Sequence, residues 1–148
     1  MIQQTLVLLK PGALQRRIIG EVLSRFERKG FNIIALKLLR PGKPLVETHY
    51  AEHKGKDFYD KLVAYTLSGP LVAMILESED AVPLARLMIG PANLMEQRPG
   101  SIRGDYAART RLNIVHASDS PESAAREIKL FFTPEEICPW EDGNAQWF

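Results

Sequence analysis

Two short, uninterrupted apolar segments constrain the fold of this chain more than any other feature of its sequence. Residues 5–9 (TLVLL) are followed at once by Lys10-Pro11-Gly12, and residues 71–76 (LVAMIL) are preceded by Ser68-Gly69-Pro70. Apolar runs of this length, bounded by proline and glycine, are typical of strands that are buried on both faces. Such strands require a sheet that is covered by helices, so we expect an α/β sandwich.

The rest of the sequence supplies helices and further strands in alternation. Apolar residues at helical spacing, ending at Gly30, predict a helix over about residues 17–29, and residues 31–39 return to β-forming types. A helix N-cap at Ser120 predicts a last helix over residues 121–132. Between these segments the pattern predicts two short helices joined by Lys54-Gly55, a helix over residues 81–89, a loop over residues 90–111 and a strand over residues 112–116. One domain is expected for 148 residues, since a domain takes roughly 100–200 residues.

The balance of charge excludes a general polyanion-binding protein. The chain has 19 basic and 18 acidic residues and a net charge of +1, so it lacks the positive field that drives non-specific binding to nucleic acids or anionic membranes. Residues 1–74 hold 12 basic and 6 acidic residues, whereas residues 75–148 hold 7 and 12. Any anion site must therefore be local.

The cysteine content and the early sequence indicate a reducing compartment and no membrane span. Cys138 is the only cysteine, which excludes an intramolecular disulfide and a multi-cysteine metal site. The longest early apolar run, residues 6–9, is far shorter than the ~20 residues that a membrane span needs, and no basic n-region precedes it. We expect a cytoplasmic protein that binds neither membranes nor, as its main ligand, nucleic acid.

One histidine and one glutamate form the first candidate for chemistry. In the expected helix 121–132, Glu127 shares a stripe with Ala124 and Ile128, so its carboxylate points toward the core and needs a partner. His116 ends the preceding strand, and the helix runs back over the sheet toward it. A hydrogen bond donated by one imidazole nitrogen to Glu127 would fix the tautomer and leave the other nitrogen free as a nucleophile. Spacing alone favours the simpler alternative, a pair that only satisfies two buried polar groups.

Three cationic residues form a second, less specific candidate. Lys10 follows strand 5–9, Arg86 lies in helix 81–89, and Arg103 lies in a glycine-containing loop. Guanidinium groups and nearby glycines suit phosphate oxygens, but the chain has neither a Walker A nor a Rossmann glycine motif. Solvated surface residues are the alternative at each of these positions.

The aromatic and histidine residues of the helical hairpin have simpler interpretations. On periodicity, Tyr50 and Phe58 are more often packing residues than a platform for base stacking. His49 and His53 are four residues apart, but no acidic third ligand stands at a diagnostic offset, so we reject a metal pair there.

Seven ordered segments closely resemble the nucleoside diphosphate kinase family, collinearly from about residue 3 to residue 136. The most specific of them contains the His-x-Ser-Asp-Ser motif at residues 116–120. The segments are residues 9–12 (LKPG), 49–53 (HYAEH), 68–74 (SGPLVAM), 86–90 (RLMIG), 99–105 (PGSIRGD), 113–120 (NIVHASDS) and 122–127 (ESAARE).

The resemblance implies a more definite fold and assembly. It implies an α+β sandwich with a ferredoxin-like βαββαβ antiparallel sheet covered by helices, to which a helical hairpin and a subunit-contact loop are added. The family-like domain would cover residues 1–136, and residues 137–148 would form an irregular tail packed on the domain or on a neighbouring subunit. A homo-oligomer, either a tetramer or a hexamer built from dimers, is implied as well.

The resemblance also implies an activity and a set of site residues. The activity is ping-pong transfer of the γ-phosphoryl group from a nucleoside triphosphate to a nucleoside diphosphate. His116 would be the nucleophile, Glu127 would hold the far imidazole nitrogen, and Ser118 would support that carboxylate. Positions that contact phosphates or ribose match Lys10, Tyr50, Arg86, Arg103 and Asn113, while Phe58 matches the base-stacking residue and Leu62 lies beneath it. Mg²⁺ would arrive with the nucleotide, because no carboxylate cluster that could cage it is evident.

Several positions depart from the family pattern. Ala92-Asn93-Leu94 replaces a Thr-Asn-Pro segment, which removes a hydroxyl worth ~1.5–3 kcal/mol to a charged partner. Gly12-Ala13 replaces Asp-Gly, Arg111-Leu112 replaces Gly-Arg, and Ala117 replaces a glycine. An alternative function is therefore a nucleotide-binding regulatory member of the fold with little or no turnover. An RNA-binding module is disfavoured because residues 29–31 are not followed by the aromatic spacing of an RNP motif.

Overall fold

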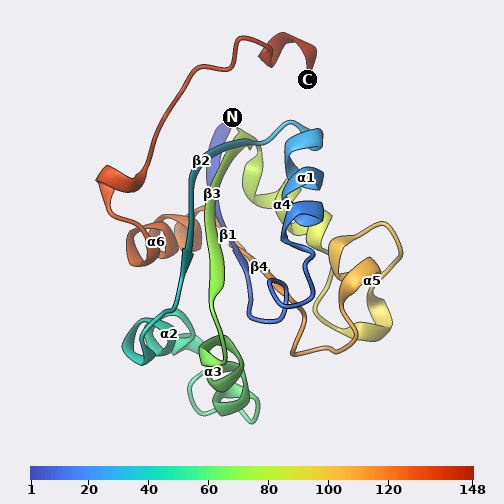
Figure 1. Cartoon of the computed structure of the whole chain (residues 1–148), viewed down its shortest axis with the longest axis vertical. Helices are drawn as coiled ribbons and strands as arrows, with labels where there is room; N and C mark the ends of the chain where they lie inside the picture. The colour runs from blue at the N-terminus through green and yellow to red at the C-terminus, as the bar shows by residue number, and fades with distance from the viewer.

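Strands β1 (Ile2–Leu9) and β3 (Leu71–Glu79) form the centre of a four-stranded antiparallel sheet, and β2 (Asn32–Leu39) and β4 (Val115–Ala117) form its edges (Figure 1). The strand order is β2-β3-β1-β4 in the computed structural model, which describes all 148 residues. The helices are α1 (Ile19–Lys29), α2 (Lys43–His49), α3 (Tyr59–Leu67), α4 (Ala81–Ile89), α5 (Ile102–Tyr106) and α6 (Pro121–Phe131), with 3-10 turns at Ala51–His53, Leu94–Glu96, Pro134–Glu136 and Ala145–Trp147. The expected α+β fold with a βαββαβ core is confirmed, and α2 and α3 form the predicted helical hairpin between β2 and β3.

Alternate side chains of the central strands pack into two separate cores. Val7 and Leu9 of β1 lie in the core beneath α1 and α4, whereas Leu6 and Leu8 lie in the core beneath α6. Figure 1 shows α1 and α4 on one side of the sheet and α6 on the other. This arrangement explains the uninterrupted apolar run, since each fully buried aliphatic side chain contributes about 1.5–3 kcal/mol.

The ends of several elements differ from the sequence prediction where the backbone turns. Helix α1 begins at Ile19 and not at residue 17, because Arg17 adopts a left-handed φ of 58°. It ends, as predicted, at Gly30, whose φ of 103° is one that glycine adopts without strain. Strand β1 begins at Ile2, ahead of the predicted residue 5, and β4 begins only at Val115. Helix α6 begins as predicted, with the Ser120 side chain accepting the N–H of Ser123.

The C-terminal tail follows strand β2 before it reaches the end of α1. The Cys138 N–H donates to the Ile34 carbonyl at 2.7 Å, and the Trp140 Nε1–H donates to the Ile33 carbonyl at 2.9 Å. The Phe148 ring lies against Gly30 although most of its surface is exposed. A neighbouring subunit as a second packing partner, and the division into a domain at residues 1–136 and a tail, stay predictions.

None of the helices is both long enough and apolar enough to cross a membrane.

Candidate active site

His116 lies in the middle of the edge strand β4, opposite Leu8 of β1. Its side chain is 18% exposed, so it is reachable from solvent but held by its surroundings. The strand is preceded by Ile114, whose φ of 63° is rare for a β-branched residue and costs about 1–3 kcal/mol. The Ile114 carbonyl accepts the Lys10 N–H at 2.8 Å, which fixes the end of β1 beside the start of β4.

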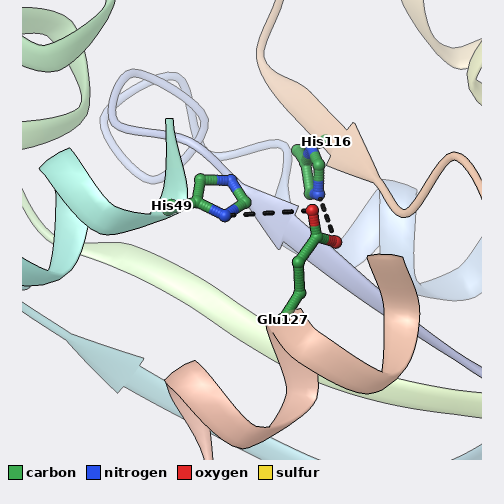
Figure 2. A group of neighbouring side chains, drawn as sticks. All are labelled: His49, His116 and Glu127. Atoms are coloured by element: carbon green, nitrogen blue, oxygen red, sulfur yellow. Dashed lines mark hydrogen bonds and ion pairs between the residues drawn. The ribbon is translucent and has the colours of Figure 1, made fainter. Parts of the chain in front are cut away.

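Glu127 connects helix α6 to the imidazole of His116 (Figure 2). Nε2 of His116 lies 2.9 Å from Oε1 of Glu127, and the Ser118 hydroxyl donates to the same oxygen at 2.7 Å. Burial opposes ionisation of Glu127, but the hydrogen bonds from His116 and Ser118 outweigh it, and the pKa of the carboxyl lies below its usual range. An ionised carboxylate can only accept, so Nε2 carries the proton and Nδ1 of the neutral ring has a free lone pair. The structure thus contains the contact that the stripe on helix 121–132 predicted.

Ser118 is itself fixed by the central strand. Its Oγ accepts the Leu6 N–H at 3.1 Å, and its own N–H donates to the Leu6 carbonyl at 3.1 Å. The hydroxyl is fully buried, and it donates its one hydrogen to Oε1 of Glu127. Strand β1 therefore orients the carboxylate through Ser118.

His49, the last residue of α2, lies beside this pair, although nothing in the sequence placed it there. Its side chain is 1% exposed, its ring centroid lies 4.7 Å from that of His116 in an edge-on arrangement, and neither of its nitrogens has a hydrogen-bond partner. Burial, followed by the charge of His116, lowers the pKa of His49 to about 3. His49 is therefore neutral at physiological pH, and the 3.9 Å between its Nδ1 and Oε2 of Glu127 is not an ion pair.

The same three side chains are the group in this structure that could hold a metal ion. The ligand atoms of His49, His116 and Glu127 lie within 4.8 Å of one another. Two imidazole nitrogens and one carboxylate are a ligand set that Zn²⁺ accepts, whereas Mg²⁺ prefers oxygen ligands alone. His53 is not part of this group: α2 ends at His49, and His53 lies in the 3-10 turn that follows.

Lys10 and Arg103 place two buried cations in the same pocket. The Lys10 Nζ donates to Oδ1 of Asn113 at 3.1 Å, and burial, followed by the charge of Arg103, lowers the pKa of Lys10 to about 7. The Arg103 guanidinium donates to the carbonyls of Gly90 at 2.9 Å and Val115 at 2.7 Å. Its buried Nε has no partner, and burial and the charge of Arg86 lower the pKa of Arg103 to about 10. Arg103 thus remains a cation whose orientation is fixed by backbone.

The other predicted contacts of phosphate and ribose surround these cations. Arg86 is exposed at the pocket and donates to the Ala117 carbonyl at 3.3 Å. The Tyr50 hydroxyl accepts from Thr66 at 3.4 Å, and burial raises the pKa of Tyr50 to about 12, so the phenol keeps its proton.

A pocket of about 270 Å³ joins these groups. Its wall includes every site residue that the sequence predicted except Ser118. Ser118 does not line the pocket, but it donates a hydrogen bond to Glu127, which does. Its lining residues are Lys10, His49, Tyr50, Glu52, His53, Phe58, Leu62, Arg86, Ala92, Arg103, Arg111, Asn113, His116, Ala117, Asp119 and Glu127.

Comparison with known proteins decides the family. The model of the family described as nucleoside diphosphate kinase matches residues 3–137. The chain belongs to the nucleoside diphosphate kinase family. A nucleoside diphosphate kinase of Treponema pallidum is 53% identical to it over 146 residues, which cover 99% of this chain and 98% of the relative. The corresponding protein of Schizosaccharomyces pombe is 51% identical over 145 residues, covering 98% and 96%.

Solved structures of the nucleoside diphosphate kinase family have the same fold. A halophilic family member from Halobacterium salinarum, solved in complex with CDP, gives a TM-score of 0.96 at 37% identity and covers 99% of this chain and 98% of its own. A family protein from Babesia bovis gives 0.93 at 42% identity, with 98% coverage of both chains. The resemblance found in the sequence is thus confirmed, and the chain is an enzyme of a family that transfers phosphoryl groups between nucleotides.

Proposed function

We propose that this family member transfers the γ-phosphoryl group of a nucleoside triphosphate to a nucleoside diphosphate by a ping-pong mechanism through a phosphohistidine at His116. The observation that carries the proposal is the 2.9 Å contact between Nε2 of His116 and Glu127, in a pocket that also holds Lys10, Arg86 and Arg103. The contact occupies one imidazole nitrogen and leaves Nδ1 as the nucleophile.

Each half-reaction is a single displacement at phosphorus. In the first, Nδ1 of His116 forms a bond to the γ-phosphorus while the bond to the β–γ bridging oxygen breaks, and the diphosphate leaves with that electron pair. In the second, a terminal oxygen of the acceptor diphosphate attacks the phosphorus, and the electron pair of the Nδ1–P bond returns to the imidazole. The imidazole gains positive character during the first step, which the ionised Glu127 stabilises across the hydrogen bond to Nε2.

The cations supply the charge stabilisation that phosphoryl transfer needs. The transferred group carries its negative charge on three equatorial oxygens, so catalysis depends on positioning and on positive charge more than on covalent chemistry. Lys10 and Arg103 are already oriented by Asn113 and by backbone carbonyls, so little reorganisation is required when phosphates arrive. Arg86 and the protonated Tyr50 offer further donors on the pocket wall.

The outer part of the pocket is suited to the nucleoside. Phe58 is half-buried and packs beside Leu62, so a base can stack on a ring that is held in place from below. Stacking on one aromatic ring tolerates different bases, which agrees with a general nucleotide kinase. Asn113 and Lys10, joined by a hydrogen bond of 3.1 Å, would contact the ribose and the phosphates. The pocket contains no cluster of carboxylates for Mg²⁺, so we propose that the substrate is the magnesium complex of the nucleotide, in which phosphate oxygens hold the ion.

Labelling with γ-³²P-ATP tests this proposal. The wild type is expected to form an acid-labile, alkali-stable phosphoprotein, and unlabelled GDP added to the isolated phosphoprotein is expected to remove the label as GTP. His116→Asn should take up no label but should still bind ADP, which controls for the integrity of the pocket. A wild type that binds ADP without labelling would contradict the proposal and would favour the regulatory alternative.

We also propose that the protein is a cytoplasmic homo-oligomer, a tetramer or a hexamer. The edge strand β2 supports assembly, because Leu36 and Leu38 are 50% and 59% exposed on it and exposed apolar patches at sheet edges are typical of contact surfaces. Light scattering on the full chain distinguishes the two assemblies from a monomer of 16.7 kDa.

A further inference from the structure

The guanidinium of Arg111 lies over the ring of Phe58, the candidate platform for the base. Its central carbon is 3.9 Å from the centroid of the Phe58 ring, and both side chains line the pocket. A planar cation at this distance occupies the space that a base would take if it stacked on that face of the ring. A nucleotide base and Arg111 therefore compete for the same face of Phe58.

Arg111 has no other interaction that would hold it over Phe58. No hydrogen bond or ion pair joins it to protein groups, although the carboxylates of Glu52 and Asp119 line the same pocket. Arg111 is exposed, so its N–H donors face solvent and are available to a ligand. The stacked position thus reflects the attraction between the cation and the ring face.

The backbone that carries Arg111 is fixed on both sides. The Asn113 side chain donates to the Thr110 carbonyl at 2.7 Å, and the Thr110 hydroxyl accepts the Leu94 N–H at 3.1 Å. Arg111 and Leu112 therefore stand at the corner of an anchored turn, where the side chain of Arg111 can move while its Cα stays in place.

We propose that Arg111 is a specificity-determining residue that lifts from Phe58 and closes on the outer face of the bound base. This inference rests on the proposed binding of nucleosides at Phe58. In the closed arrangement the base lies between an aromatic ring and a planar cation. A purine presents a larger π-surface to both than a pyrimidine does, so Arg111 favours purine nucleotides. A ligand without a base gains nothing from it.

Isothermal titration calorimetry on the full chain tests this inference, with GDP, CDP and tripolyphosphate as ligands. We expect Arg111→Met to weaken GDP binding by about two- to fivefold, as for loss of one cation–π contact at an exposed site, and CDP binding by less, so that the ratio of the CDP to the GDP dissociation constant falls, while tripolyphosphate binding is unchanged. Arg109→Met is the matched control, since Arg109 is an exposed arginine of the same segment outside the pocket wall and should alter none of the three.

Two results would overturn the inference while leaving the proposed function intact. One is an equal loss of affinity for all three ligands in Arg111→Met, which would make Arg111 a phosphate contact. The other is an unchanged ratio of CDP to GDP. A wild type that binds tripolyphosphate but neither nucleotide would contradict the proposed function as well.

Discussion

Nδ1 of His49 lies 3.9 Å from Oε2 of Glu127, yet the two residues are not an ion pair, because His49 is neutral there. Both hydrogen bonds to Glu127 reach its other oxygen, Oε1. The neutral His49 ring thus packs beside the carboxylate without forming an ion pair with it. The negative charge of Glu127 therefore interacts mainly with His116.

The unpartnered nitrogens of His49 predict an unusual response to mutation. Replacing an unsatisfied buried polar group by an apolar one of similar size is nearly neutral, so His49→Leu should keep the free energy of unfolding within about 1 kcal/mol of the wild type. His49→Ala should lose about 2–4 kcal/mol, because it leaves a cavity next to His116 and Phe131. Urea denaturation measures both. A large loss in the leucine variant would show that the nitrogens have partners in solution.

The depressed pKa of Lys10 predicts proton uptake when nucleotides bind. The pKa of about 7 leaves Lys10 mostly neutral at pH 8 in the free enzyme, and nearby phosphates raise it again. Binding of ADP at pH 8 should therefore take up nearly one proton, and the uptake should decline toward pH 6, where Lys10 is already charged. Calorimetry in buffers of different ionisation enthalpy measures this number. Lys10→Met should abolish it, and equal uptake in that variant would assign the proton to another group.

Replacing Glu127 should lower both the rate of phosphohistidine formation and the stability of the protein, and the loss of stability should depend on pH. Glu127→Gln removes the charge opposite His116, so the rate of phosphohistidine formation should fall on the order of 10²-fold. The folded carboxyl has a pKa below its unfolded value, so its contribution to stability is present at neutral pH and is lost as the pH falls through the lowered pKa. Denaturation at pH 7 and at pH 3–4 should show that the difference in free energy of unfolding between the variant and the wild type becomes smaller in acid. A difference that becomes larger in acid would contradict the lowered pKa of Glu127 in the folded protein.

Replacing Ala92 by threonine should increase the affinity for ADP. Ala92 lines the pocket at a position where the resemblance in the sequence implies a threonine, so Ala92→Thr should tighten ADP binding by about tenfold through one hydrogen bond to a phosphate. Ala92→Val is the control, because it has the same shape without the hydroxyl. An equal gain in both variants would attribute the effect to packing.

The sequence predicted those parts of the site that depend on periodicity or on the ends of strands. The turn after Lys10 predicts its position at a strand end, and the stripe on helix 121–132 predicts Glu127 beside His116. Both predictions depend only on local geometry, and the structure has both features. The two cores also follow from local pattern, since a continuous apolar run requires cover on both faces of the sheet.

His49 and Arg111 were missed for different physical reasons. The spacing of His49 and His53 corresponds to one helical turn, but α2 ends at His49, and its ring packs against His116 while His53 lies in the following 3-10 turn. Arg111 lies in an irregular segment with no period, so its stacking on Phe58 is set by tertiary structure alone. The left-handed Ile114 has no sequence signal either, since a β-branched residue is among the least expected at positive φ.

The cations of the pocket also affect the stability of the whole folded protein. Lys10, Arg86 and Arg103 share one cavity, and no carboxylate forms an ion pair with any of them. Their mutual repulsion destabilises the folded protein, and a phosphate-containing anion bound among them would offset it. A ligand that binds only the folded state stabilises it in proportion to the logarithm of its concentration. We therefore expect a higher melting temperature in phosphate than in chloride, and a resistance to proteolysis that increases with the concentration of nucleotide.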